Sequence, residues 1–93
     1  MLIRSQDKKS LYNISTNKGL WITARAKGVT VVAEGLGNIG QYSTEAKAIK
    51  VLDMIQMANF RVEKMKMIYS HSGHLSNSCI QDFTFQMPQD EEV

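Results

Sequence analysis

Apolar and polar positions alternate in short runs over the first 42 residues of the chain. The alternation is clearest from Leu20 to Lys27, where apolar and polar side chains fall on opposite faces of an extended backbone. Polar or glycine-rich segments separate the runs, which is typical of strands joined by hairpins. The predicted strands cover residues 2–5, 10–14, 20–27, 29–34 and 39–42.

A helical period replaces the alternation after Tyr42. Ser43 or Thr44 can cap a helix, and Glu45 places a negative charge in its first turn, so we predict a helix from this point to about Ile68. The core-facing stripe of this helix is Val51, Ile55, Ala58, Val62 and Met65. A second line with heptad spacing places two methionines between basic residues: Lys47, Lys50, Met54, Met57, Arg61 and Lys64.

The predicted helix is long for a chain of this size. About 25 residues extend over roughly 37 Å, whereas a five-residue strand extends over roughly 17 Å. Part of the helix therefore needs another partner, and we expect self-association through Met54 and Met57, because methionine adapts to irregular contacts. The alternative is a break near Asn59 that produces two shorter helices.

The end of the chain predicts a return to the sheet. Residues 70–78 are rich in Ser, Gly and Asn and predict a loop, residues 83–87 alternate as a strand, and Pro88 ends that strand. The sequence thus predicts an α+β fold, with a small antiparallel β-sheet of about five to six short strands packed on one long α-helix. Residues 1–88 form a single domain, and residues 89–93 form a flexible acidic tail.

Composition agrees with one globular domain. The chain has 93 residues, of which 43% are hydrophobic and 22% charged. Its apolar runs are too short to span a bilayer, and its first residues lack the apolar core of a signal peptide. The single cysteine fits a reducing compartment. We therefore expect a cytoplasmic protein without a membrane partner.

Charge is unevenly distributed along the chain. Residues 1–66 hold all 11 lysines and arginines, whereas residues 67–93 hold four carboxylates and no lysine or arginine. A basic body attracts phosphate groups, although the same pattern also fits an ordinary solvated surface. The cations form no dense cluster, which argues against a nucleic-acid partner.

Two motifs suggest chemistry that their surroundings do not support. Residues 35–40 match G-x-G-x-x-G, but the predicted helix begins only after Tyr42, so a glycine-rich hairpin turn is the preferred interpretation. His71, His74 and Cys79 offer three metal ligands, whereas a closed zinc site needs four. We expect no metal, no cofactor and no catalytic residues, hence no enzyme.

One face of the strand at residues 20–27 suggests ligand binding. Trp21 can stack on a base, and Arg25 and Lys27 can hold phosphate. The alternative is that Trp21 covers the edge of the core or an oligomer interface while the cations face water.

Three segments carry a resemblance to known proteins. At residues 1–9, at residues 42–48 with Val51 and Leu52, and at residues 85–88, the chain resembles a family of small, mostly uncharacterised proteins encoded by phages and prophages of Gram-positive bacteria. In its predicted shape it also resembles phage anti-defence proteins that sequester nucleotide immune signals, including the Thoeris and CBASS inhibitors. Fold alone does not establish function.

These likenesses imply a phage-encoded protein that binds a small cyclic nucleotide or an ADP-ribose-type signal at a subunit interface, without cleaving it, in the cytoplasm of the infected bacterium. Three arginines are expected to hold phosphates and three aromatic residues to contact the base: Arg4, Arg25 and Arg61, and Trp21, Tyr42 and Phe85. One alternative is a protein-interaction module that inhibits a host enzyme through the acidic tail or the methionine line. Another is a small DNA-binding regulator, for which no helix-turn-helix is evident.

Overall fold

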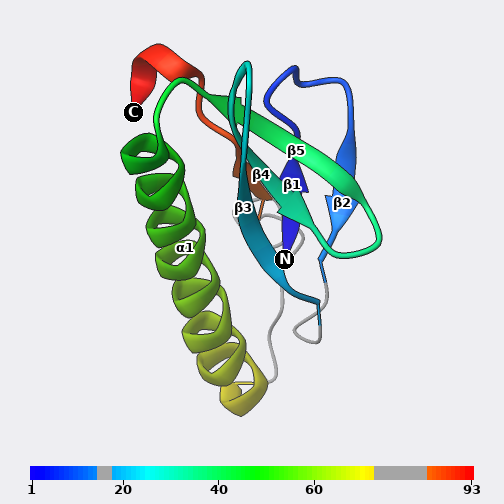
Figure 1. The fold of residues 1–93 in the computed structure, drawn as a ribbon. Helices are drawn as coiled ribbons and strands as arrows, with labels where there is room; N and C mark the ends of the chain where they lie inside the picture. Colours follow the sequence, from blue (N-terminus) through cyan, green and yellow to red (C-terminus); the bar gives the residue numbers. More distant parts are fainter. Residues whose placement is uncertain (15–17, 73–83) are drawn as a thin grey trace.

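The computed structural model describes residues 1–14, 18–72 and 84–93, with the side chains of the helix described as far as Met65. Six strands and one long helix in these residues confirm the predicted α+β class (Figure 1). In chain order the elements are β1 (Leu2–Arg4), β2 (Leu11–Asn13), β3 (Leu20–Arg25), β4 (Gly28–Ala33), β5 (Gly37–Tyr42), α1 (Glu45–Ser72), β6 (Thr84–Gln86) and a short 3-10 helix, η1 (Asp90–Glu92).

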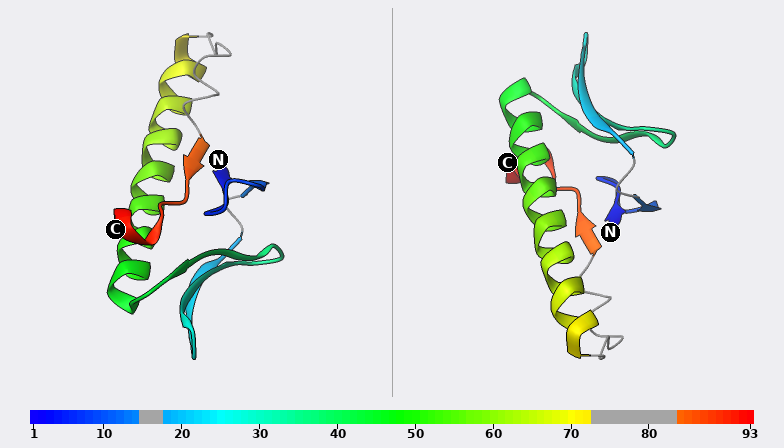
Figure 2. Two further views of the ribbon diagram at one scale, coloured as in Figure 1. Left: turned by 90° about the horizontal axis from the view of Figure 1, so that it is seen from above. Right: turned by 90° about the horizontal axis from the view of Figure 1, so that it is seen from below.

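The strands divide into two sheets of three, which corrects the expected single antiparallel sheet. The first sheet has the order β2-β1-β6 and the second the order β3-β4-β5. β6 pairs with β1 in parallel, whereas the other pairs are antiparallel. A parallel pair needs a long connection, and here the connection contains α1. Both sheets lie on the same side of α1 (Figure 2).

The core lies between α1 and the facing sides of the two sheets. Val29, Val31 and Ala33 alternate along the central strand β4 and are buried. From the first sheet, Ile3 is completely buried, and Met87 follows β6 into the same cluster. A bulge between Val31 and Val32 shifts the register of β5 against β4.

The long helix confirms the predicted core stripe. Val51, Ile55 and Val62 are buried, and Ala58 and Met65 are partly buried. Thr44 precedes the helix, and its Oγ1 accepts a hydrogen bond from the backbone N of Lys47 at 3.2 Å, as expected of a cap. The helix continues without interruption past residue 59 to Ser72, so the alternative of a break is wrong, and it ends four residues later than predicted.

Gln6 joins the two sheets through its backbone and side-chain amides. Its backbone N donates to the carbonyl O of Ile39 at 3.2 Å. Its side-chain Nε2 donates to the carbonyl O of Gln41 at 2.9 Å, and its Oε1 accepts from the backbone N of Gln41 at 2.8 Å. The side chain of Gln6 thus makes the pair of hydrogen bonds that a neighbouring strand would make with the free edge of β5.

The C-terminal residues, where a flexible tail is expected, fold back onto the start of α1. The carboxylate of Asp90 accepts a hydrogen bond from the backbone N of Ser43 at 2.8 Å. The same carboxylate lies 3.4 Å from Nζ of Lys47. The ammonium of Lys47 also donates a hydrogen bond to the backbone O of Asp90 at 2.9 Å. The positive end of the helix dipole attracts a carboxylate at this position.

Candidate functional site

A groove of about 380 Å³ follows the side of α1 next to β6, and we call it the methionine groove. Helical spacing explains most of it, because residues that are three, four or seven apart lie on one face. β6 supplies the remaining wall. The groove is lined by Lys50, Asp53, Met54, Met57, Ala58, Arg61 and Phe85.

The methionine groove has cations at both ends, and between them lie apolar side chains and the carboxylate of Asp53. Lys50 and Arg61 are separated by 11 residues, about 16 Å along the helix axis. Met54 and Met57 between them are 38% and 55% exposed. Both methionines therefore lie outside the core, as the predicted second line of the helix requires.

A smaller recess of about 160 Å³ adjoins the methionine groove. Arg61, Ala58 and Phe85 line both cavities, and Met1 and Thr84 line only the recess. The aromatic ring of Phe85 therefore belongs to an apolar surface that continues from the groove toward the N-terminus of the chain.

The six predicted site residues do not form one site within a single copy. Arg61 and Phe85 are brought together in the methionine groove. Arg4 is exposed on β1, and its NH1 donates to the backbone O of Lys8 at 3.3 Å. Tyr42 is 1% exposed, so its ring is a core residue and cannot wall a ligand.

The remaining two predicted residues share the outer face of β3. Trp21 is 43% exposed and Arg25 is exposed, whereas Leu20 and Ile22 pack against the core. The predicted alternation is thus confirmed at residues 20–22 but fails at Ala24, which is exposed rather than packed in the core. The strand ends at Arg25, and Lys27 lies in the turn to β4. On the same face, the Oγ1 of Thr23 is buried without a hydrogen-bond partner among the described residues. Trp21, Thr23 and Arg25 are not among the lining residues of the methionine groove.

Sequence reasoning missed two exposed apolar residues of α1. Ile49 is 45% exposed and Phe60 is 63% exposed. Their positions on the helix could have revealed them, because both lie opposite the core stripe, on the same side as Met57. The outer face of α1 is therefore more apolar than the methionine line alone predicted.

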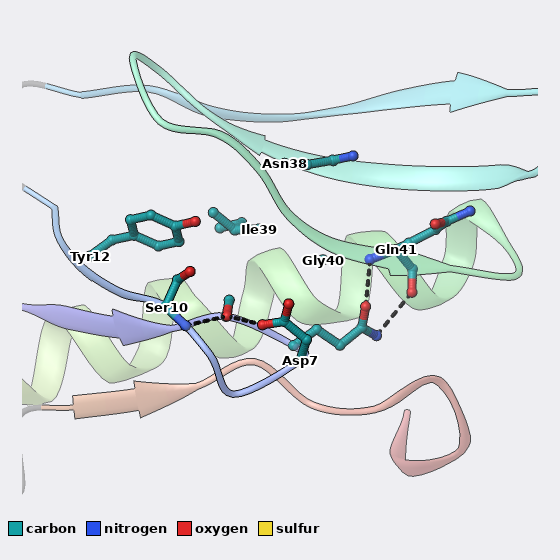
Figure 3. Close-up of a pocket in the computed structure, with 9 residues that line it drawn as sticks. Asp7, Ser10, Tyr12, Asn38, Ile39, Gly40 and Gln41 are labelled. Atoms are coloured by element: carbon teal, nitrogen blue, oxygen red, sulfur yellow. Dashed lines mark hydrogen bonds between the residues drawn. The ribbon is translucent and has the colours of Figure 1, made fainter.

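A separate, polar pocket of about 200 Å³ lies between the β1–β2 hairpin and β5 (Figure 3). In this view Tyr12 and Ser10 lie on one side and Ile39 on the other. Asp7 accepts hydrogen bonds from Oγ of Ser5 at 2.5 Å and from a backbone N at 3.0 Å, and these bonds hold its pKa below the ordinary value of 3.8. The carboxylate thus holds the hairpin turn together.

The glycine motif lies in the β4–β5 hairpin, as predicted. Gly35 and Gly37 have φ angles of 78° and 85°, in the left-handed region that favours glycine. The candidate metal ligands His74 and Cys79, and the side chain of His71, lie outside the described residues. Among the residues that the structure does describe, no group of three or more His, Cys, Asp or Glu is placed to hold a metal ion.

Comparison of the chain with protein-family models, curated proteins and solved structures gave no match. In the described part of the chain, no helix combines the length and the apolar character that crossing a membrane requires.

Proposed function

We propose that the protein is a binding protein without catalytic activity, and that it sequesters a small cyclic nucleotide or ADP-ribose-type ligand in the methionine groove. The observation that carries this proposal is the combination, in one groove, of two cations, against the single carboxylate of Asp53, with an apolar wall that includes Phe85. The phage resemblance supplies the setting: removal of a nucleotide signal in an infected bacterium would silence the host's immune response.

Each part of the ligand has a counterpart in the groove. A guanidinium such as that of Arg61 matches phosphate in geometry and charge, and Lys50 adds a second positive charge. A base can pack on the ring of Phe85 and on the two methionines, whose flexible thioethers fit flat surfaces. The groove volume of about 380 Å³ lies within the usual range for small-molecule sites.

Calorimetry with a panel of cyclic nucleotides and cyclic ADP-ribose isomers tests the proposal. We expect at least one tight ligand, recovered unchanged by mass spectrometry after incubation. Arg61→Ala should weaken its binding roughly 10- to 100-fold, as the loss of a charged hydrogen bond does. Arg25→Ala, which removes another exposed arginine, on β3, is the matched control and should bind normally. No binding across the panel, or equal loss in both variants, would refute the groove as the site.

A second candidate function is surface inhibition of a host enzyme. The exposure of Ile49 and Phe60 favours it, because exposed apolar side chains on one face mark protein contacts. The acidic tail is less suited to that contact, since Asp90 is bound to Ser43 and Lys47. A stoichiometric host protein recovered on immobilised wild-type chain, and lost with Phe60→Asp, would favour this alternative.

A further inference from the structure

Hydrogen bonds on both sides hold the walls of the polar pocket between the β1–β2 hairpin and β5 (Figure 3). Oγ of the buried Ser5 accepts from the backbone N of Ser10 at 3.1 Å and donates to Asp7, which closes the hairpin turn. On the other side, the side chain of Gln6 bonds to the backbone N and O of Gln41. The pocket is therefore formed without a ligand, and a ligand would pay little to order it.

Four side chains that line this pocket keep hydrogen-bonding groups that the fold does not use. Oδ1 of Asp7 accepts both bonds that the turn makes to this carboxylate, whereas its Oδ2 accepts none from another described residue. The hydroxyls of Ser10 and Tyr12 and the side-chain amide of Asn38 likewise make no hydrogen bond with another described residue. All four groups are available to a ligand.

The charges around the pocket narrow the class of that ligand. Asp7 is the only charged side chain among the described lining residues, and its neighbours in the turn, Lys8 and Lys9, do not line the pocket. A phosphate or carboxylate would therefore meet a negative charge without a cation to balance it. An ammonium ion would satisfy Asp7, but it has only donors and gives no acceptor to the two hydroxyls and the amide.

A neutral ligand with several hydroxyls satisfies all four side chains, and we infer that the pocket binds one sugar ring. Each sugar hydroxyl can donate to Oδ2 of Asp7 or to another acceptor while it accepts from Ser10, Tyr12 or Asn38, and such chains of hydrogen bonds strengthen one another. The C–H groups of the ring have an apolar surface to pack on, because the ring of Tyr12 points toward Ile39 (Figure 3).

The size of the pocket limits the ligand to about one ring. Its volume of about 200 Å³ is below the roughly 300 Å³ at which pockets for drug-sized molecules begin. A free monosaccharide and the ribose of a nucleoside share the required chemistry. The pocket and the methionine groove have no lining residue in common, so the sugar site does not depend on the proposed function.

Titration of the full chain, followed in amide proton–nitrogen NMR correlation spectra, tests the site. The probes are ribose, glucose, N-acetylglucosamine and adenosine. At least one should shift the backbone amides of Ser10, Asn38 and Gly40 in a saturable way, with the millimolar dissociation constant expected of a small neutral ligand. Tighter binding of ribose and adenosine supports a nucleoside as the source of the ring, and tighter binding of the other two supports a glycan. No saturable shift at these amides with any probe overturns the site.

Two substitutions remove free groups of the pocket and leave the hydrogen bonds that build it. Tyr12→Phe keeps the aromatic ring without its hydroxyl, and Asn38→Ala removes the amide. Each should weaken sugar binding roughly 2- to 10-fold, as the loss of one neutral hydrogen bond does. Asn13→Ala removes an exposed asparagine of β2 that does not line the pocket, so it is the matched control and should bind normally. Equal losses at residues 13 and 38, or normal binding by both pocket variants, overturns the proposed contacts.

Asp7→Asn tests the role of the carboxylate. Asparagine keeps one oxygen for the hydrogen bonds of the turn and replaces the second oxygen with a donor, so sugar binding should fall roughly tenfold or more. Methylammonium and inorganic phosphate are the probes for the other ligand classes. The inference requires that both bind at this pocket more weakly than the best sugar, and tighter binding of either one overturns the neutral ring. The spectrum of each variant without ligand shows whether it is folded.

Discussion

Tyr42→Phe is the sharpest test of how the end of the chain is held to the core. The Tyr42 ring is 1% exposed, and its hydroxyl donates to the backbone O of Pro88 at 2.9 Å. The substitution removes this hydroxyl and leaves the ring in place. It therefore isolates one hydrogen bond between β5 and the C-terminal segment.

The expected cost at neutral pH follows from that single bond. Loss of one buried neutral hydrogen bond lowers the free energy of unfolding by about 1 kcal/mol. The carbonyl of Pro88 keeps a donor, Nε2 of Gln6 at 3.2 Å, so no buried acceptor is left without a partner. For a chain of this size the loss corresponds to a melting temperature lower by roughly 4–8 °C.

The sign of the effect should reverse at high pH. Burial raises the pKa of Tyr42 from 10.0 to about 12, and the carboxylates of Asp90 and Glu92 add to the increase. Because the folded state holds the proton more tightly, the wild type has this stabilisation in full below pH 10 and loses it as the pH rises toward 12. The loss is about 1.4 kcal/mol at pH 11 and about 2 kcal/mol at pH 12. Phenylalanine does not titrate, so the variant does not lose this stability at high pH.

Urea unfolding followed by far-UV circular dichroism, at pH 8 and at intervals to pH 11.5, measures the difference between the two chains. Tyr42→Phe should be less stable at pH 8, equal near pH 11 and more stable above it. All other titrating groups are common to both chains and cancel in the difference. A gap that stays constant from pH 8 to pH 11.5 would refute the reasoning about burial. Ligand binding in the methionine groove should be unchanged, because Tyr42 does not line it.

Two further substitutions test local features of the fold. Gly28 has a φ of +130°, and an added Cβ would lie 2.7 Å from the backbone O of Tyr42, so Gly28→Ala should lower the free energy of unfolding by about 2–4 kcal/mol in urea titrations. Gly37→Ala, at a φ of +85° with no atom within 4 Å, should cost only about 1–2 kcal/mol, and equal costs would contradict the close contact. The hydrogen bonds from Ser43 and Lys47 hold the pKa of Asp90 below its ordinary value of 3.8, so its stabilisation is present above that pH and lost as the pH falls through the lower folded value. Thermal melts should therefore show Asp90→Ala less stable than the wild type at pH 7, with the difference shrinking below pH 4, and a difference independent of pH would count against the contact.

Local sequence patterns predicted the strands and the helix of this fold. They did not predict the division into two sheets, which depends on pairing between distant segments. The strand from Leu20 and the helical stripe from Val51 depend on neighbouring residues only, and both are confirmed, although the predicted alternation in burial holds only at residues 20–22. The division into two sheets depends on β6 joining β1, a contact between opposite ends of the chain. Gln6 shows the same limit: in sequence it is an ordinary turn residue, whereas in space its side chain bonds to residues 35 and 82 positions away.

The acidic end of the chain makes specific contacts that composition does not predict. Several adjacent carboxylates before a terminus usually indicate a mobile segment. Here Asp90 finds the backbone N of Ser43 at the start of α1, and Glu92 returns its carboxylate to the backbone N of Gln89 at 2.8 Å. Each contact depends on a single carboxylate at a specific position, and the net charge of the segment does not reveal such contacts.

The candidate site depends on α1 in a way that the strand face does not. On β3, Trp21 and Arg25 are exposed residues on one face of a single strand. On α1, the spacing of Met54, Met57 and Arg61 follows from the helix itself, and β6 brings Phe85 against them to form a groove. The inner face of α1 packs on the core, and the outer face presents apolar side chains to solvent. The residues that stabilise the fold and the residues available for binding therefore lie on different faces of the same helix. Residues on the outer face are therefore free to specify a partner without changing the core that Val51 and Val62 stabilise.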